Sequence, residues 1–368
     1  MNASLNEKLR TVKWGEFKYK EVFNRIEQGR RLKKDDQIDG TIPFVMSGTT
    51  NAGVVNYISN PVASFPKNAI TIDIFGNTFY RNYAFGAGDD TGVYWNDATA
   101  YSSNAMLFFA VAMQKSMMGR FSYGKKLRSS QSEDFTMHLP VTDDGTIDFD
   151  FTESFIAELE AERVAELSAY LTVSGLDNYE LSNNEMAIIE RYKKHQIPFS
   201  EFEFIKIFNN IKQGRRLKKD DQLPGDIPFV MSGTTNTGVI GYISNPVARF
   251  PKNSITIDIF GNSFYRNYDF GAGDDTGVYW NTEKEYSRTC MLFFAAAMGR
   301  ALRGKYSYGK KLRSSQSIHF KMQLPTKDGK PDYDAMAALI SAVQKLVIKD
   351  VVLYADRKIE KTKDVTKR

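Results

Sequence analysis

The sequence contains little cysteine, little histidine and no long apolar run. Among its 368 residues Cys290 is the only cysteine, so an internal disulfide is excluded and a reducing cytosol is the expected environment. The three histidines, His138, His195 and His319, are scattered, which gives no support for a metal site or for histidine base catalysis. No apolar run approaches 18 residues and the first residues lack the apolar core of a signal peptide. We therefore expect a cytoplasmic protein with no membrane partner.

The most informative feature that is present is an internal duplication. Residues 17–140 and 202–325 align without a gap, and 36 of the 124 aligned positions differ, which leaves 88 identical. A repeat of this length has the size of a domain rather than of a solenoid unit. Cys290 is replaced by Ala105 in the first copy, which favours a small buried residue over a reactive thiol. The chain should therefore carry two near-copies of one domain and engage a target that presents two like sites.

Charge follows the boundaries of the repeats. The first repeat has 14 Lys and Arg against 11 Asp and Glu (+3), and the second has 18 against 10 (+8). The segment between them, residues 141–201, has 4 against 14 (−10), and the final 24 residues have 8 against 4 (+4). A single charged run is usually solvated surface. The match between charge and repeat boundaries instead favours a polyanion contacted at two places, with the acidic spacer facing something else.

The order of short apolar segments and turn residues in each repeat indicates a mixed α+β domain. In the first copy, residues 42–46, 70–75 and 92–95 have the composition of short strands, and turns are predicted at 51–53 and 76–77. Residues 106–113 form a more continuous apolar stretch, for which we predict a helix.

Long helices are predicted after each repeat. The first spans about 152–173, with Asp150 or Thr152 as its cap, and the last spans about 335–361, with Asp334 as its cap. A shorter helix is predicted at 184–194. Two long amphipathic helices that leave equivalent domains can pair as an antiparallel coiled coil with pseudo-two-fold symmetry. The predicted domains are the first recognition domain (1–145), the helical spacer (146–197), the second recognition domain (198–329), and a C-terminal helix with a basic tail (330–368).

Polar residues interrupt the apolar stripes of these two helices. Arg163 could face Asp350 across the seam and fix its register, or it could bond Glu160 or Glu166 within its own helix. The acidic outer face of the first helix is a candidate docking surface for a partner, through Glu158, Glu162 and Glu166.

Several enzyme-like motifs are incomplete. Residues 85–88 resemble the glycine-rich cofactor loop of methyltransferases and residues 60–63 their catalytic loop, but each lacks residues that the chemistry needs. Asp73, Asp89 and Asp90 could form part of a magnesium-dependent nuclease site, although a capped turn explains the Gly-Asp-Asp-Thr-Gly tract at 88–92 more simply. We therefore predict no catalytic residue and no metal ligand. A self-contained nuclease or DNA-modification enzyme with an unusual site remains the alternative.

The basic clusters and a polar loop are the best candidates for contact with nucleic acid. Lys and Arg neutralise phosphates, while Arg and Asn can read base edges and short hydroxyl side chains can bond either. The competing interpretation is that these are exposed loops with ordinary lysines. The candidates in the first repeat are Arg30, Arg31, Lys33, Lys34, Ser47, Thr49, Thr50, Asn51, Arg81, Tyr123, Lys125, Lys126 and Arg128. Their counterparts are Arg215, Arg216, Lys218, Lys219, Ser232, Thr234, Thr235, Asn236, Arg266, Tyr308, Lys310, Lys311 and Arg313.

An ordered series of motifs occurs in both repeats. In the first copy the series is Ile42-Pro43-Phe44-Val45, Asn51-x-Gly53-Val54, Ile70-Thr71-Ile72, Phe79-Tyr80, Tyr123-Gly124-Lys125-Lys126-Leu127, Leu139-Pro140 and the helix that follows. In this series the chain resembles the specificity subunit of type I restriction–modification systems, or the equivalent subunit of type IIB systems. The resemblance covers nearly the whole chain. Family members usually carry two dissimilar recognition domains, whereas these two are about 71% identical, which bears on the DNA site that is read.

The resemblance implies a non-catalytic subunit that recognises double-stranded DNA sequence-specifically. It also implies recruitment of methyltransferase subunits, two in number, which would bring S-adenosylmethionine, so that no cofactor is bound by this chain itself. A restriction subunit is a further partner that it implies. An orphan DNA-binding regulator or anti-restriction decoy is a third interpretation. Because the two domains are nearly identical, we expect a bipartite target whose half-sites are inverted repeats.

Overall fold

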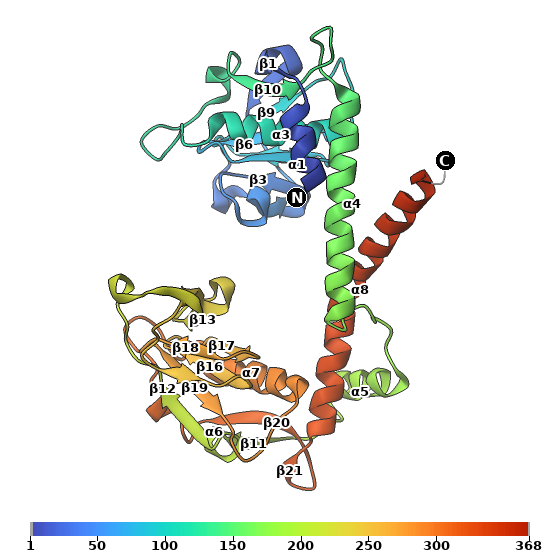
Figure 1. Ribbon diagram of the computed structural model, residues 1–368. Coiled ribbons are helices and arrows are strands. Elements are labelled where there is room, and N and C mark those ends of the chain that lie inside the picture. Colours follow the sequence, from blue (N-terminus) through green and yellow to red (C-terminus); the bar gives the residue numbers. More distant parts are fainter. Residues whose placement is uncertain (1–2, 367–368) are drawn as a thin grey trace. The chain divides into compact units, whose positions relative to one another are not determined.

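The computed structural model describes residues 3–366, with side chains up to residue 361. The chain divides into two compact units. One runs to Leu167 and takes in the segment from Ala355 onward, and the other comprises Ser168–Tyr354. Each unit contains one repeat, and the predicted mixed α+β class is confirmed for both (Figure 1). The last two residues of the predicted basic tail lie outside the described part.

The first domain contains three small sheets and one main helix. The strand orders are β1-β10, β2-β9-β6-β7 and β4-β3-β8-β5. Its helices are α1 (Ala3–Thr11), α2 (Tyr19–Val22) and α3 (Ser103–Met117). Its strands are β1 (Trp14–Lys18), β2 (Arg25–Gln28), β3 (Asp39–Val45), β4 (Val54–Ile58), β5 (Ser64–Phe65), β6 (Ala69–Asp73), β7 (Thr78–Arg81), β8 (Phe85–Ala87), β9 (Thr91–Trp95) and β10 (Thr136–Pro140).

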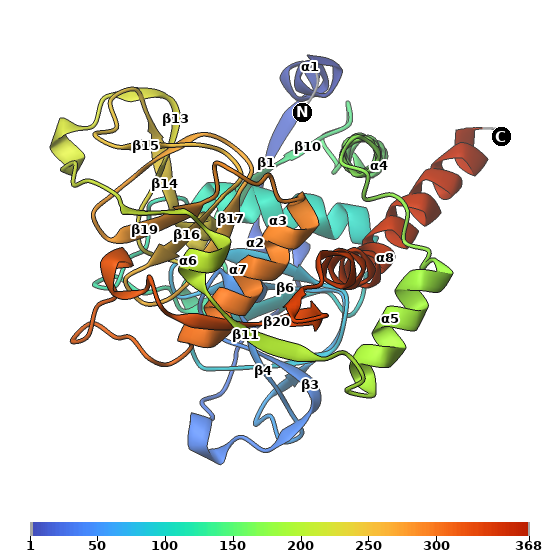
Figure 2. The same ribbon diagram turned by 90° about the horizontal axis from the view of Figure 1, so that it is seen from below.

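The second domain repeats this topology, with orders β11-β20-β21, β12-β19-β16-β17 and β14-β13-β18-β15. Its helices are α6 (Phe204–Ile207) and α7 (Arg288–Leu302), and α7 lies along the β16–β17 part of its sheet (Figure 2). Its strands are β11 (Phe199–Glu203), β12 (Asn210–Gln213), β13 (Pro224–Val230), β14 (Val239–Ile243), β15 (Arg249–Phe250), β16 (Ser254–Asp258), β17 (Ser263–Arg266), β18 (Phe270–Ala272), β19 (Thr276–Trp280), β20 (Lys321–Lys327) and β21 (Lys330–Pro331).

The core of each domain explains why these segments adopt their structures. Every residue of β6 is buried, including the polar Thr71 and Asp73, and α3 covers the sheet with Phe109 and Met113 fully inside. The helix begins where the Ser102 hydroxyl accepts a hydrogen bond from the Ala105 amide (3.1 Å) and ends before Gly119, whose φ is 73°. Each fully buried Phe contributes about 1.5–3 kcal/mol of burial free energy. The packing of α3 on the sheet thus anchors the loops that carry polar and basic residues.

The three helices predicted outside the repeats are confirmed as α4 (Phe149–Val173), α5 (Asn183–Lys193) and α8 (Tyr333–Thr366). Their predicted caps were wrong: Asp150 and Asp334 lie two residues, and Thr152 four residues, past the capping aspartates, because both long helices begin earlier than the apolar stripe suggested. The Asp148 carboxylate accepts from the Phe151 amide (2.8 Å), and the Asp332 carboxylate accepts from the Ala335 amide (3.0 Å). Within residues 3–366, no helix combines the length and apolar character that a membrane span needs.

Candidate nucleic-acid interface

The predicted loops of the first domain meet around one short tract, residues 87–91, between β8 and β9. This central tract is hydrogen-bonded to the strand end and loop of β3, to the segment after β2 and to the end of β6. The bonds run from Gly88 N to Val45 O (2.9 Å), from Ser47 N to Asp90 Oδ2 (3.0 Å), from Arg30 N to Ala87 O (2.9 Å) and from Ile74 N to Asp90 O (3.0 Å). Segments that are far apart in sequence therefore gather at one end of the domain.

Gln28 joins the two basic clusters. Its side-chain amide donates to the Asp89 carbonyl (3.0 Å) and accepts from the Ser129 amide (2.8 Å). The Arg128 guanidinium donates to the same Asp89 carbonyl. The structure thus anchors the basic segments 30–34 and 123–128 at a common point.

The basic arm, residues 30–34, leaves β2 through Gly29. A Cβ on Gly29 would lie 2.2 Å from the carbonyl oxygen of Gly88, so the arm crosses the central tract closely enough that only glycine fits. The cations that follow, at 30, 31, 33 and 34, are all exposed. Asp35 and Asp36 come directly after these cations, so residues 28–37 carry both signs of charge rather than only positive charge. The arm presents four solvated cations on a fixed base, which suits contact with phosphates.

The second basic segment forms a tight turn with an exposed aromatic ring. Ser122 and Lys125 exchange backbone hydrogen bonds (3.1 and 3.0 Å), which places Tyr123 and Gly124 at the tip. The Tyr123 side chain is 83% exposed, and the Lys126 ammonium lies 4.7 Å from its ring centre. An exposed ring beside a lysine is a surface suited to a polyanion.

The polar loop 47–51 is held by a buried carboxylate. Asp73 accepts five hydrogen bonds, from the Ser47 hydroxyl (3.0 Å), the Gly48 amide (3.0 Å), the Phe75 amide (2.8 Å), the Asn77 amide (2.9 Å) and the Asn77 side chain (2.8 Å). Asp73 thus caps the turn at residues 75–77. In the Gly-Asp-Asp-Thr-Gly tract, for which a capped turn was predicted, Asp90 accepts a hydrogen bond from the Thr91 hydroxyl (3.2 Å). The Ser47 hydroxyl is engaged inside the domain, while the side chains of Thr49, Thr50 and Asn51 are exposed.

Arg81 corrects the sequence prediction of a DNA contact. It is 1% exposed, and its guanidinium donates to the Thr71 hydroxyl (3.0 Å), the Tyr83 hydroxyl (3.1 Å) and the Ala52 carbonyl. Burial lowers its pKa, and the Tyr83 hydroxyl partly offsets that shift. The sequence could not distinguish this buried arginine from a surface one, because aromatic neighbours accompany both. Arg81 positions the polar loop instead of facing solvent, and Arg266 does the same in the second domain.

The second domain reproduces this arrangement. Asp258 accepts the equivalent five hydrogen bonds, from Ser232, Gly233, Phe260 and Asn262. Gln213 bonds the Asp274 carbonyl (3.0 Å) and the Ser314 amide (2.8 Å), and Tyr308 is 82% exposed beside Lys311. The side chains of Arg215, Arg216, Lys218, Lys219, Thr234, Thr235, Asn236, Lys310 and Arg313 are exposed, as are those of Lys125, Lys126 and Arg128 in the first domain.

Sequence identity between the copies is concentrated in the segments that meet at this end. Its longest uninterrupted runs are 28–37, 42–51, 70–77, 85–96 and 122–132. Outside these runs, residues 18–22, 97–100 and 114–118 differ at every position. The central tract was interpreted from sequence only as a turn, although it lies within the longest identical run. That run was the signal that could have located it.

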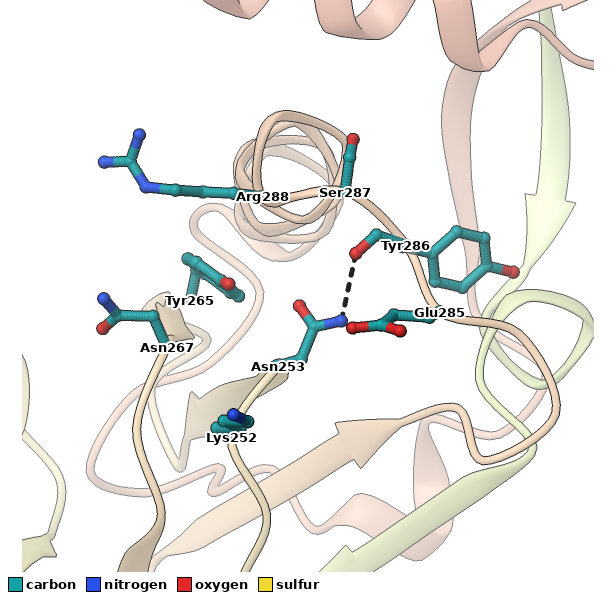
Figure 3. A pocket seen from close by; sticks show the side chains of 8 residues that line it. All are labelled: Lys252, Asn253, Tyr265, Asn267, Glu285, Tyr286, Ser287 and Arg288. Atoms are coloured by element: carbon teal, nitrogen blue, oxygen red, sulfur yellow. Dashed lines mark hydrogen bonds between the residues drawn. The ribbon is translucent and has the colours of Figure 1, made fainter. Parts of the chain in front are cut away.

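Two depressions in the surface differ in their relation to this end. A groove of about 730 Å³ lies beside the basic arm, between Gly29–Arg31 and Ala63–Phe65. Another, of about 470 Å³, lies in the second domain at the opposite end of β16 from Asp258, where Asn253 donates to the Tyr286 carbonyl (3.0 Å) (Figure 3). Its lining residues Glu285 and Arg288 replace Ala100 and Ser103, so this second depression is not part of the surface that the copies share.

A comparison with protein families decides the assignment. The sequence profile described as the type I restriction modification DNA specificity domain matches residues 11–169 and again residues 200–351. The chain belongs to this family. Both matches include a complete copy of the shared loops, so the two domains are two specificity domains.

One curated protein is similar to this chain in sequence, and one solved structure is similar to it in fold. The specificity subunit of the type II restriction enzyme BcgI from Heyndrickxia coagulans is 28% identical over 155 residues, which cover 41% of this chain and 45% of that protein. The chain thus aligns with less than half the length of this curated relative. The S subunit of a type I restriction–modification system from M. genitalium has a similar structure, with a TM-score of 0.53 at 14% identity over 96% of this chain and 94% of that one. This likeness supports the fold.

The acidic face of α4 is already engaged by the chain's own cations. Glu158 is paired with Lys8 of α1, and Glu160 with Lys358 of α8 (2.5 Å). Arg163 forms an ion pair with Glu166 of its own helix (2.5 Å). The sequence had left this pair open as an alternative to a pair between Arg163 and Asp350. Glu158 and Glu166 are exposed and Glu162 is half-buried. The docking surface predicted from Glu158, Glu162 and Glu166 is therefore less available than the sequence suggested.

Proposed function

We propose that this protein recognises a DNA sequence as the specificity subunit of a restriction–modification complex and performs no catalysis itself. The proposal rests on the end of each domain where the loops gather around residues 87–91 and around residues 272–276 of the second copy. There, exposed cations flank an exposed polar loop, and the segments involved are the longest identical runs of the duplication. Membership in the DNA specificity family supports it.

The two kinds of side chain have different tasks. The arm cations at 30, 31, 33 and 34, with Lys125 and Lys126, are placed to bind phosphates, which contributes affinity without reading sequence. Thr49, Thr50 and Asn51 are exposed on a loop held by Asp73 and Arg81, and in this proposal they bond base edges. A rigid loop reads better than a mobile one because fewer side-chain conformations must be frozen on binding.

The duplication points to a bipartite target with two like half-sites. Since the exposed residues of the polar loop and the arm are identical in both copies, each domain should prefer the same few bases. Pairing of α4 and α8 as an antiparallel coiled coil would relate the domains by a pseudo-two-fold axis, so the half-sites would form an inverted repeat. The Glu160–Lys358 ion pair supports contact between these helices at one point.

The proposed protein partners are DNA methyltransferase subunits, two in number, which would supply S-adenosylmethionine, together with a restriction subunit. The long helices offer a surface for them. Val343, Leu346 and Val347 of α8 expose about half or more of their side chains, at positions that repeat along one side of the helix. An exposed apolar stripe of this kind is typical of a protein-binding face.

An enzyme acting alone is the competing function. In the described part of the chain, no three His, Cys, Asp or Glu side chains are grouped so that they could hold a metal ion. Asp73, one of the three aspartates considered for a nuclease site, accepts hydrogen bonds from five donors. Both facts favour the specificity subunit.

The test is direct. The purified protein is incubated with a random DNA library, bound DNA is sequenced, and the same DNA is then incubated with protein plus Mg²⁺ or labelled S-adenosylmethionine. We expect an enriched bipartite motif, with the DNA neither cut nor methylated. Cleavage or methylation by the protein alone would instead establish the enzyme. Co-purification from the native host distinguishes a subunit, which brings a methyltransferase, from an orphan regulator, which does not.

A further inference from the structure

A set of exposed apolar side chains recurs on both copies and is called the apolar patch here. It consists of Ile38, Val55, Tyr57 and Val62 in the first domain and of Leu223, Ile240, Tyr242 and Val247 in the second. Each of the eight side chains exposes more than half of its surface. Single exposed apolar residues are ordinary, but a set that recurs at equivalent positions indicates a binding surface.

The differences between the copies preserve the apolar character. Ile38 becomes Leu223 and Val55 becomes Ile240, so two of the four positions have changed and both remain aliphatic. The neighbouring positions 39, 41 and 56 have changed chemical class, to Pro, Asp and Gly. Exposed positions that serve no purpose are free to become polar. An external partner that requires apolar contact explains why these have not.

Two members of the patch, Val55 and Tyr57, lie on β4, which forms a two-stranded ribbon with β3, while Ile38 directly precedes β3 and Val62 follows β4. β3 pairs with β8 only through Phe44 and Val45, so residues 39–43 form with β4 an antiparallel pair of strands that stands clear of the rest of the sheet. Val55 and Tyr57 alternate along β4 and therefore share its outer face. Tyr57 is directly opposite Pro43 in the register. Figure 2 shows β3 and β4 away from α1 and α3 of the domain.

The two ends of the ribbon connect it to the proposed DNA surface. At one end, where Phe44 and Val45 join the sheet, the ribbon continues into the polar loop 47–51. At the other end, the Ser59 amide donates to the Ile38 carbonyl (2.8 Å), and the Asn60 side chain accepts from the Ile38 amide (2.9 Å) and donates to the Asp36 carbonyl (2.9 Å), two residues after the basic arm. The apolar patch therefore lies between the groups placed to read bases and the cations placed to bind phosphates.

We infer that the outer face of this ribbon, in each domain, enters the major groove and contacts the 5-methyl groups of thymines in the half-site. The inference rests on the proposed function. A two-stranded ribbon fits the width of the major groove, and the thymine methyl is the apolar group that base edges present there. The flanking cations of the arm favour a polyanion over an apolar protein surface as the occupant. Each half-site must then contain at least one A·T pair under the ribbon.

The experiment uses the full chain and its selected target, made once with thymine and once with deoxyuridine at every thymine of the half-sites. This exchange removes only the methyl groups and preserves base pairing. We expect binding to weaken about fourfold for each methyl that the ribbon contacts. The double variant Val55→Ser with Ile240→Ser should bind the thymine target more weakly and lose the difference between the two DNAs. Val111→Ser, an exposed valine of α3, is the matched control and should behave as the unchanged protein.

Three results would overturn the inference while leaving the proposed function intact. They are half-sites that contain no A·T pair, equal binding of the thymine and uracil targets, and a ribbon variant that keeps the full thymine preference. If the variant instead binds DNA normally but no longer co-purifies with a methyltransferase, the patch is a protein contact and the inference is wrong. Absence of any sequence preference in the unchanged protein would be a failure of the proposed function itself.

Discussion

Arg81 holds Ala52 in a left-handed backbone conformation. Ala52 has φ 50° and Asn51 has φ 48°, and the buried guanidinium of Arg81 donates to the Ala52 carbonyl. In the second domain Arg266 donates to the carbonyl of Thr237, whose φ is 53°. Two successive non-glycine residues in this region cost roughly 1–3 kcal/mol each, so the loop needs an interaction that offsets the cost. A charge-assisted bond from a buried arginine supplies it.

Replacing Arg81 should therefore impair sequence recognition more than general DNA affinity. Arg81→Leu removes the tether of the polar loop, and we expect specific binding to fall by about 10- to 100-fold, the worth of a hydrogen bond to a charged group. Arg81→Lys should also fail, because it lacks the planar fork. Since no exposed cation is removed, affinity for random DNA and its salt dependence should not change. Binding titrations at several salt concentrations measure both.

The duplication provides the control for this prediction. Arg266→Leu should produce the same effect at the other half-site, and a target with one altered half-site distinguishes the two variants. If Arg81→Leu instead weakened all DNA equally and lowered the log–log salt slope by about 0.9, Arg81 would bind a phosphate after all.

Gly29→Ala should destabilise the first domain. The added Cβ would meet the backbone of residues 87–88 at 2.2–2.7 Å, where no flexible side chain can move aside, so we expect a loss of about 2 kcal/mol or more. Gly124→Ala is the matched control on the same surface, because its Cβ meets open space and its backbone is not left-handed. The control should stay within about 0.5 kcal/mol of the unchanged protein. Urea denaturation compares them, and equal stability of the two variants would refute the close crossing of the arm.

Lys33 and Lys34 should act through phosphate neutralisation. Changing both to Ala removes two exposed cations without altering the loop that reads bases. We expect specific and non-specific binding to weaken alike, and the salt slope to decrease by about 0.9 for each phosphate that the protein no longer neutralises. Lys218 and Lys219 offer the same test in the second domain. Unchanged affinity across a range of salt concentrations would mean that the arm is ordinary solvated surface.

Glu185 should make the second unit sensitive to acid. Burial alone would raise its pKa, but hydrogen bonds from Lys345, Ser341 and Ser182 outweigh burial and lower the pKa to about 2, from 4.5. Because the folded pKa is depressed, the stabilisation is complete above about pH 4.5 and disappears as pH falls towards 2. Glu185→Gln should cost about 1–3 kcal/mol at pH 7. The gap from the unchanged protein should close between pH 4.5 and 2.

Denaturation in urea at several pH values measures this difference. Glu190→Gln, an exposed carboxylate on the same helix, is the control and should have little effect at any pH. A constant gap between Glu185→Gln and the unchanged protein down to pH 2 would contradict the argument.

The sequence predicted what local patterns encode. The apolar stripes of α4 and α8, the Ile-Thr-Ile run of β6 and the Gly-Asn turn after it all carry their signal within a few residues. Pairing of β1 with β10 joins segments more than 100 residues apart, and neither segment has a local feature that reveals the other. The gathering of loops around residues 87–91 depends on such distant pairings, so it could not be predicted either.

Arg81 and Glu158 show a second limit. Whether a charged side chain faces solvent or a buried carbonyl depends on the three-dimensional neighbours of the residue, and composition around it is the same in both cases. Arg81 was predicted on the surface and is buried, whereas Glu158 was predicted to face a partner and is paired with Lys8. The cations of the arm, which extend from a loop that glycine fixes, were predicted as exposed and are exposed.

The measurement that tests the central claim most directly is selection of bound sequences from a random DNA library with the full protein. The account predicts a bipartite motif in which both half-sites have the same sequence, arranged as an inverted repeat, because identical loops occur in both domains. Two unrelated half-sites, or no enriched sequence, would contradict it.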